Sequence, residues 1–232
     1  MSLGYIPRFF SVALWVGLML AVGGLVAPKM THAATWSTWT KQSSPVFTGQ
    51  YGVAGDPSVT RDATGYSMSY TCLDWTILDP NFETFAYSLN LSLCQARSSN
   101  GLTWQSVPTT DYIEGLMLRG RRGMWDENLE TSFLLKNGTE SLLFYSGYQD
   151  ESPLLPGFPA ALNVARSTDG TTFSRISSAP VLATTPGWYD NDAIYSPTII
   201  KNGSSFVMVY AGHCYFNCRY GSGAFLDRKS VV

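Results

Sequence analysis

Short apolar runs, arranged in pairs around a polar turn, recur along the chain. In two copies the runs flank the tripeptide Lys-Asn-Gly, at 136–138 and again at 201–203. Aromatic and β-branched runs on either side of Asn-Gly are typical of a β-hairpin. Outside the N-terminus, no stretch carries apolar residues convincingly at the 3.6-residue period of a helix. The pattern therefore predicts a chain that is nearly all β.

The hairpins share one internal spacing. Three pairs of residues stand 13 positions apart: Pro57 and Tyr70, Ser132 and Tyr145, and Pro197 and Tyr210. A supersecondary unit that returns with a fixed spacing indicates a repeat architecture. We therefore expect the three hairpins to occupy equivalent places in one fold.

A second, offset repeat adds two more strands to each unit. Residues 96–104 and 165–173 share Ala-Arg-Ser, then Asn-Gly or Asp-Gly, then an aromatic residue. Four antiparallel strands in roughly 65–75 residues form one blade of a β-propeller. The count predicts an isolated outer strand at 36–47, two whole blades, and a third blade that stops after its second or third strand.

The two ends of the chain differ from the repeats. Residues 9–27 are almost wholly apolar, and small residues at Thr31 and Ala33 suit cleavage after Ala33. We expect 1–33 to be a signal peptide and 34–226 a partial propeller of a secreted protein; an uncleaved membrane anchor is the alternative. The last six residues, Asp-Arg-Lys-Ser-Val-Val, can be encoded by the start of a common sequencing adapter. We therefore expect 227–232 to be a non-native tail on a longer natural protein; a genuine charged tail is the alternative.

Charge argues against a nucleic-acid partner. The formal net charge is −2, and cleavage after Ala33 removes two basic residues and no acidic one. Nucleic-acid binding is associated with a basic face. The basic cluster Arg119-Gly120-Arg121-Arg122 is short, and we interpret it as a solvated loop.

Four cysteines in a secreted chain favour disulfides. Cys72 ends the second strand of blade one and Cys94 lies in the third, so we expect these two to pair, and Cys214 to pair with Cys218. His213, Cys214 and Cys218 form an alternative metal site, but no fourth ligand is in sight. We expect no metal and no cofactor.

Carboxylates and aromatic rings are the remaining candidates for chemistry. After cleavage the chain has one histidine, His213, which disfavours a Ser-His-Asp mechanism. In a propeller the innermost strands start at one mouth of the central channel; there the repeat places Asp56, then Glu130 with Thr131, then Tyr195 with Ser196. Convergent carboxylates beside aromatic rings suit glycosidic bond cleavage. Asp-Pro and Ser-Pro before a strand also serve as simple turn chemistry, which is the alternative for Asp56.

The repeat resembles that of a known enzyme superfamily. Trp125-Asp126 and Trp188-Tyr189-Asp190 precede the inner strands, followed in the third copy by Ser-Pro-Thr-Ile-Ile-Lys-Asn-Gly and Tyr-Ala-Gly. This combination is similar to the five-bladed propeller glycoside hydrolases of families 43, 32, 62, 68 and 117. The resemblance covers about residues 36–226, and it implies a glycosidase acting on poly- or oligosaccharides.

The resemblance also assigns roles. In those families a blade-one aspartate acts as base or nucleophile, and Gly55-Asp56-Pro57-Ser58-Val59 matches its motif. Family 43 adds a blade-two aspartate and a blade-three glutamate as acid, where this chain has Thr131 and Tyr195. Glu130 is then the candidate acid, with Asp190 and Asp192 behind it.

Sugar binding is expected from aromatic side chains. Trp75, in the insertion between Cys72 and Cys94, and Tyr195 are the candidate substrate-binding residues, because ring faces pack on the C–H surfaces of sugars. A non-catalytic carbohydrate-binding propeller is the alternative to an enzyme. A protein-binding propeller is a third.

Overall fold

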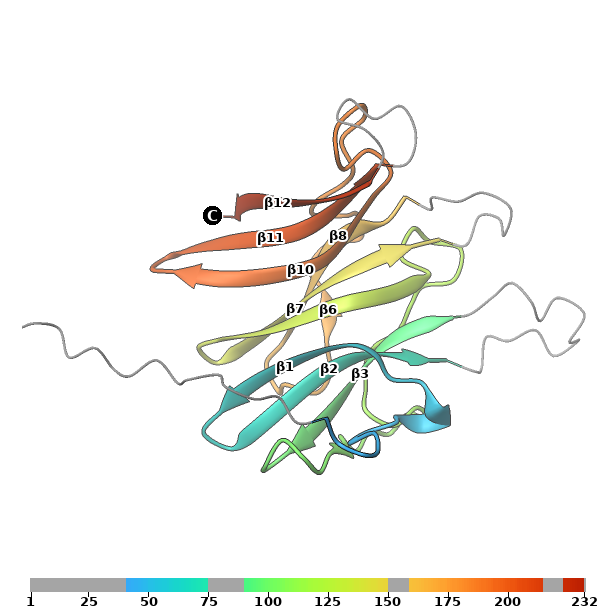
Figure 1. The fold of residues 1–232 in the computed structure, drawn as a ribbon, viewed down its shortest axis with the longest axis vertical. Coiled ribbons are helices and arrows are strands. Elements are labelled where there is room, and N and C mark those ends of the chain that lie inside the picture. Colours follow the sequence, from blue (N-terminus) through green and yellow to red (C-terminus); the bar gives the residue numbers. More distant parts are fainter. Residues whose placement is uncertain (1–40, 75–89, 150–158, 215–222, 232) are drawn as a thin grey trace, which may run out of the picture. The chain divides into compact units, whose positions relative to one another are not determined.

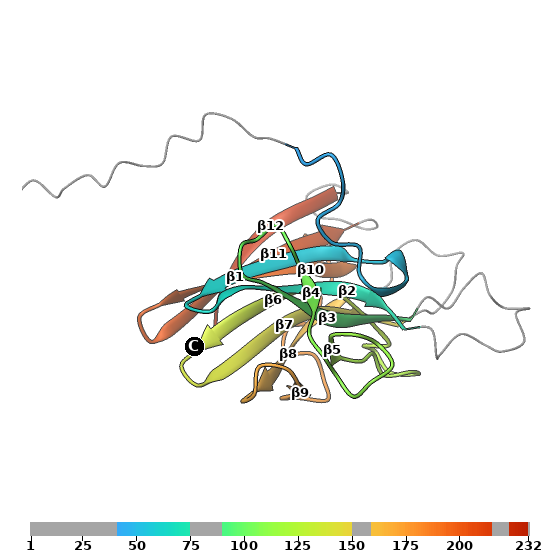
Figure 2. The same cartoon turned by 90° about the horizontal axis from the view of Figure 1, so that it is seen from below.

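The structure is a computed structural model that describes residues 41–74, 90–149, 159–214 and 223–231. The chain divides into two units after Ser43, and the strands of the described residues belong to the second unit. Three antiparallel sheets follow one another along that unit, and Figures 1 and 2 show them from two directions. Among the described residues, the only helical element is the 3-10 turn η1 (Gln50–Gly52), and no helix is long and apolar enough to cross a membrane.

The first sheet, blade one, has the strand order β1-β2-β3-β4, and β5 also pairs with β3. Its strands are β1 (Gly55–Asp62), β2 (Gly65–Leu73), β3 (Leu91–Ser98), β4 (Gln105–Ser106) and β5 (Leu116–Leu118). The second sheet, blade two, repeats the order with β6 (Asn128–Asn137), β7 (Glu140–Tyr148), β8 (Ala161–Ser167) and β9 (Ser174–Arg175). The predicted four-stranded blades and their turns are confirmed.

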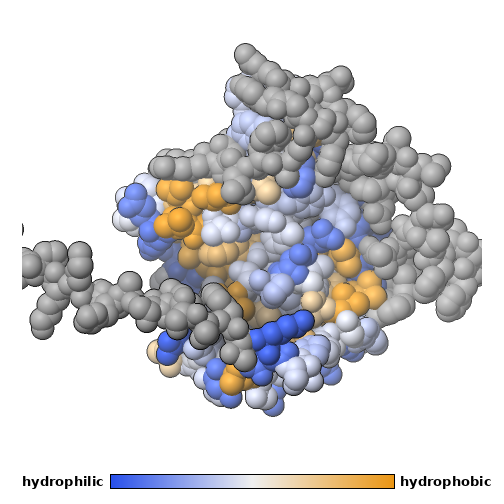
Figure 3. All heavy atoms as spheres, viewed as in Figure 1, coloured by the Kyte–Doolittle hydropathy of each residue, from blue (hydrophilic) through white to orange (hydrophobic). Residues whose placement is uncertain are grey.

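The third sheet, blade three, has the order β10-β11-β12. Its strands are β10 (Ala193–Asn202), β11 (Ser205–Cys214) and β12 (Gly223–Val231). The segment 227–231, which we predict to be non-native, continues the ladder of β12 against β11. Backbone hydrogen bonds form this ladder whatever the side chains are, so the pairing leaves the origin of the segment open. In Figure 3 apolar colour gathers over β10 and β11, where Ile200 is 56% exposed.

The blades also repeat each other in register. Gly55 pairs with Thr71, Glu130 with Ser146, and Tyr195 with Ala211. In each blade the register shifts directly after this pair, which marks a β-bulge in the inner strand. The 13-residue spacing in the sequence therefore reports a shared strand register with a shared irregularity.

Two hydrophobic cores lie between consecutive blades, and a third lies on blade one, where Met68, Tyr70 and Ala96 are buried. Leu93 of blade one is buried with Leu129 and Leu143 of blade two, and Leu162 of blade two is buried with Ile194 of blade three. Each such side chain contributes roughly 1.5–3 kcal/mol by leaving water. The inner strand β6 contacts both β1 and β10, so burial stacks the sheets with their inner strands side by side.

A small motif explains the repeated Tyr-x-Gly. A Cβ added to Gly147 would lie 2.7 Å from the Cβ of Asp126 and 3.0 Å from the Trp125 ring. Gly212 has the same relation to Asp190 and to the ring of Tyr189. In blades two and three the aromatic-Asp pair before the inner strand therefore packs on the glycine two residues after the tyrosine, and it leaves no room for a side chain.

Two interpretations from the sequence need correction. Arg119 and Arg121 are not in a solvated loop, because they form ion pairs at 2.6 and 2.7 Å with the fully buried carboxylates of Asp74 and Asp126. The predicted outer strand at 36–47 is absent from its described part, 41–47, where Phe47 instead packs edge-on against the Tyr70 ring. The interpretation of the arginines was wrong because a buried carboxylate needs a cation, and the composition around the arginines does not show which carboxylates are buried.

Candidate functional site

The three inner strands converge on one cavity of about 420 Å³. Each strand contributes the residue directly after its shared register pair: Asp56 from β1, Thr131 from β6 and Ser196 from β10. The next residues of each strand complete the wall: Pro57, Ser58, Val59, Ser132, Phe133, Pro197 and Thr198. The sequence predicts that Asp56, Glu130 with Thr131, and Tyr195 with Ser196 converge; of these residues, Asp56, Thr131 and Ser196 line the cavity.

These three residues have an unusual backbone. Their φ angles are 46° at Asp56, 46° at Thr131 and 54° at Ser196. The left-handed region costs an L-residue roughly 1–2 kcal/mol, and aspartate tolerates it better than a β-branched threonine does. Strain of this kind clusters at functional sites, where the surrounding structure fixes it. Here the bulge fixes it and directs one polar side chain per blade at the cavity.

Hydroxyl groups on the second strands hold two of these side chains. The Thr71 hydroxyl donates to Oδ2 of Asp56 at 3.1 Å, and the hydroxyls of Thr131 and Ser146 lie 2.6 Å apart. Thr71 and Ser146 occupy the same register position, where blade three has Ala211. In blade three the backbone N–H of Ser196 donates to Oγ1 of Thr131 in blade two at 3.0 Å. This hydrogen bond joins the two blades at the cavity.

Glu130, the candidate acid, lies one residue before Thr131. It is half-buried, and the Tyr148 hydroxyl donates to its Oε1 at 3.0 Å. Glu130 is not among the residues that line the 420 Å³ cavity. It therefore flanks the cavity along the strand.

Tyr195 takes the place of Glu130 in blade three. Its ring packs edge-to-face on the His213 imidazole, with ring centroids 5.4 Å apart. Burial lowers the pKa of His213, so the imidazole is neutral at neutral pH. The backbone N–H of Asp192 donates to the His213 carbonyl at 3.0 Å, and Oδ1 of Asp192 accepts from Nδ2 of Asn191 at 2.5 Å. Tyr195, His213 and Asp192 thus form one group at the start of blade three.

Asp190 belongs to the packing motif and not to this group. It is 1% exposed, and its Oδ2 accepts from the hydroxyls of Tyr210 and Thr185 at 3.3 and 3.4 Å. Asp126 is its equivalent in blade two, where it accepts from the Tyr145 hydroxyl at 3.4 Å. Burial raises the pKa of Tyr145 to about 12, so this hydroxyl stays protonated and able to donate. The geometry favours a structural role for both aspartates.

The cysteine prediction is confirmed as far as the described residues allow. Cys72 and Cys94 form a disulfide between β2 and β3. Cys214 is also disulfide-bonded, while Cys218 and the candidate sugar-binding residue Trp75 lie outside the described residues. Across the described ranges, no group of three His, Cys, Asp or Glu side chains gathers as a metal site.

Sequence reasoning missed Thr71 and Tyr148, which hold the two candidate carboxylates. A signal exists for Thr71. The step of 15 residues from Asp56 to Thr71 equals that from Thr131 to Ser146, and both steps end on a hydroxyl.

No protein-family model and no curated protein matches the chain. Solved structures do match. A glycoside hydrolase is 13% identical with a TM-score of 0.55, over 83% of this chain and 51% of that one. Zg3597, a family 117 glycoside hydrolase of the marine bacterium Zobellia galactanivorans, is 16% identical with a TM-score of 0.55, over 76% and 51%. The fold is that of the propeller glycoside hydrolases.

The match to the Bombyx mori family 32 β-fructofuranosidase BmSUC1 has 17% identity and a TM-score of 0.53, over 76% of this chain and 32% of that one. The chain therefore spans about half the length of these structures, or less. At such identities the likeness establishes the partial propeller fold. The family resemblance expected from the repeat motifs is confirmed at that level.

Proposed function

We propose that this chain is part of a secreted glycosidase that hydrolyses glycosidic bonds in poly- or oligosaccharides. The fold it shares with propeller glycoside hydrolases supports this, as does the position of Asp56. An apolar segment at 9–27 followed by small residues at Thr31 and Ala33 supports secretion. A mature N-terminus at Ala34 in the secreted protein is the expected result of N-terminal sequencing.

Hydrolysis of a glycosidic bond needs two carboxyl groups. One protonates the leaving oxygen, and the other takes a proton from water or attacks the anomeric carbon. Asp56 serves as the base or nucleophile, because it is an exposed carboxylate in the cavity and a hydroxyl holds one of its oxygens. Glu130 serves as the acid, with the Tyr148 hydroxyl orienting its carboxyl group.

One observation carries the proposal. Asp56 is the carboxylate that lines the cavity, and a strained bulge with φ of 46° directs it there. A residue kept in a costly conformation at the convergence of three repeats is best explained by a role in that cavity.

The test is turnover of aryl-glycosides and release of reducing ends from a panel of polysaccharides. Asp56→Asn keeps size and hydrogen bonding but removes the charge, and we expect turnover to fall by at least about 100-fold. Glu114→Gln removes an exposed carboxylate in another part of blade one and should leave turnover unchanged. Full turnover by Asp56→Asn would end the assignment of Asp56.

A non-catalytic carbohydrate-binding propeller is the second candidate. Thr131 and Tyr195 stand where the resembled family 43 has its other two carboxylates, and this observation favours it. The candidate predicts that oligosaccharides bind at the cavity without release of sugar. Calorimetric binding combined with zero turnover across the panel would establish it over the enzyme.

A further inference from the structure

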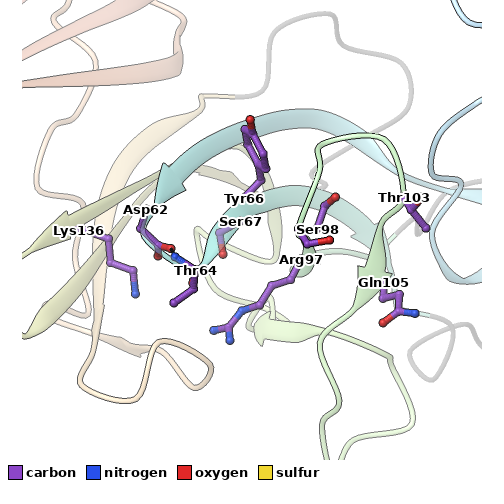
Figure 4. Close-up of a pocket in the computed structure, with 10 residues that line it drawn as sticks. Asp62, Thr64, Tyr66, Ser67, Arg97, Ser98, Thr103, Gln105 and Lys136 are labelled. Atoms are coloured by element: carbon purple, nitrogen blue, oxygen red, sulfur yellow. Dashed lines mark hydrogen bonds between the residues drawn. The ribbon is translucent and has the colours of Figure 1, made fainter.

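A second groove lies at the other end of β1, away from Asp56. Asp56 is the second residue of β1 and Asp62 is the last, so six steps of about 3.3 Å per residue separate them by roughly 20 Å. The groove has a volume of about 540 Å³, and its walls come from the β1–β2 turn, the end of β3, and β6. Figure 4 shows its lining, which is dominated by polar side chains.

Two cations of different blades converge beside this groove. A Cβ placed on Gly170 would lie 3.2 Å from Nζ of Lys136 and 3.9 Å from Nη2 of Arg97. The two nitrogens are therefore separated by at most the sum of these distances, about 7 Å. Figure 4 shows both charged ends directed to the same side of the groove, with Thr64 and Asp62 between them.

Among the residues that the structure describes, neither cation has an ion-pair partner. The ion pairs among the described residues all belong to Arg119, Arg121 and Arg175. Asp62 is the carboxylate of the groove, and its Oδ1 already accepts from the N–H and the hydroxyl of Thr64, at 2.7 and 2.6 Å. One carboxylate offsets one of two positive charges, so the groove keeps an excess positive charge.

The other blades show what Lys136 lacks. Arg61 in blade one and Lys201 in blade three occupy the same position of the inner strand as Lys136. Each of these two cations lies over the aromatic ring of its cross-strand partner, which is Tyr66 for Arg61 and Phe206 for Lys201. Lys201 also donates to Asn137 at 3.0 Å. In blade two the cross-strand partner of Lys136 is Ser141, which has no ring. Lys136 therefore cannot make the cation–π contact with a cross-strand ring that Arg61 and Lys201 make. Its ammonium group lies near Gly170, as does the guanidinium group of Arg97.

We propose that the groove between Arg97 and Lys136 binds a sugar unit that carries a carboxylate or a sulfate, as part of an acidic oligosaccharide. An oxyanion accepting charge-assisted hydrogen bonds of about 2.8 Å from each cation spans the gap between them. Thr103 and Gln105 line the same groove and supply a hydroxyl and an amide group that match sugar hydroxyls. This binding site is separate from the cavity at Asp56 and does not depend on hydrolysis.

The test is isothermal titration calorimetry on the full chain carrying Asp56→Asn, so that no ligand is consumed. The probes are tetragalacturonate, a sulfated galactan tetrasaccharide, the neutral galactotetraose and inorganic sulfate, each at low and raised salt. We expect one or both acidic tetrasaccharides to bind, with an affinity that falls as salt rises, and galactotetraose to bind at least about 10-fold more weakly. The acidic tetrasaccharide that binds more tightly identifies the oxyanion.

Variants at the two cations locate the binding. Arg97→Gln and Lys136→Gln should each weaken it about 10-fold. Ser141→Tyr keeps every charge but restores the ring of the other blades, and it should also weaken binding. Arg166→Gln and Lys201→Gln change the same charges at the equivalent positions one blade further on, and should change affinity less than about twofold.

Three results would overturn the proposal. Equal binding of neutral and acidic tetrasaccharides would remove the role of the oxyanion. Equal losses in the control variants would show general charge attraction. Inorganic sulfate binding as tightly as the sulfated tetrasaccharide would remove the role of the sugar. Because Asp56 lies at the far end of β1, loss of binding here leaves the proposed hydrolysis standing, and loss of turnover leaves this site standing.

Discussion

Substitution of Gly147 by alanine tests whether the aromatic-Asp pair fixes the start of the inner strand in blade two. The new Cβ would lie 2.7 Å from the Cβ of Asp126, 3.0 Å from the Trp125 ring and 3.2 Å from the Asp126 backbone. Contacts under 3.0 Å force a shift, and here the obstacle includes backbone. Inserting one methyl group into such packing costs about 1–3 kcal/mol.

A shift of Asp126 away from the new Cβ would also weaken the ion pairs that Asp126 makes. Its two carboxylate oxygens accept from Nε of Arg121 and Nε of Arg175 at 2.7 and 2.6 Å, and its side chain is fully buried. Moving a buried carboxylate away from its cations lengthens bonds that nothing else replaces. We therefore expect Gly147→Ala to lower the free energy of unfolding by about 2–4 kcal/mol.

Urea unfolding followed by tryptophan fluorescence measures this change. The matched control is Gly55→Ala, also a strand glycine, whose added Cβ would meet only the Thr71 Cβ at 3.6 Å. That is an ordinary contact, so the control should stay within about 0.5 kcal/mol of the parent. Gly212→Ala meets the Cβ of Asp190 at 2.9 Å and should show the packing cost alone, about 1–3 kcal/mol. If Gly147→Ala is as stable as the control, the packing argument is refuted.

Three further outcomes are expected. Thr71→Val keeps the shape but removes the hydroxyl that donates to Asp56, and kcat should fall by about 10-fold while the melting temperature changes little; an unchanged kcat would show that this bond does not orient the carboxylate. Replacing both Cys72 and Cys94 by alanine opens a cross-link over 22 residues and should lower the stability by about 3 kcal/mol, measured by denaturant unfolding against the parent under oxidising conditions. Because burial holds the pKa of His213 below its unfolded value, the unfolded chain binds more protons there. Stability should therefore decline as pH falls through about 6.5, less so in His213→Gln, and identical pH curves for both proteins would contradict this.

Much of the fold can be predicted from the sequence because the repeat is local. Asn-Gly turns and alternating apolar runs specify hairpins within about 20 residues, and the 13-residue step carries the register from one hairpin to the next. The pairing of Cys72 with Cys94 follows from the same register, since their strands are neighbours. These features depend on short-range backbone geometry, which composition and spacing encode directly.

The candidate site was less predictable because it depends on contacts between distant residues. Asp190 precedes an inner strand and carries a carboxyl group, so the sequence alone places it among the catalytic candidates. Only the structure shows that Asp190 is buried and accepts a hydrogen bond from the Tyr210 hydroxyl. Arg119 looks like part of a solvated cluster until the buried carboxylate of Asp74, 45 residues away in the sequence, is placed next to it. Long-range partners of this kind leave no local pattern.

The bulge at the start of each inner strand sets the backbone of the cavity wall independently of which side chain stands there. The same left-handed backbone carries an aspartate in blade one, a threonine in blade two and a serine in blade three. Since the register shift sets the conformation and the side chain does not, each blade can change its contribution by a single substitution without rebuilding the sheet. Thr131→Asp would add a second carboxylate to the cavity by one such step. A scaffold of this form can gain, lose or exchange catalytic groups one blade at a time, while its cores between the blades stay as they are.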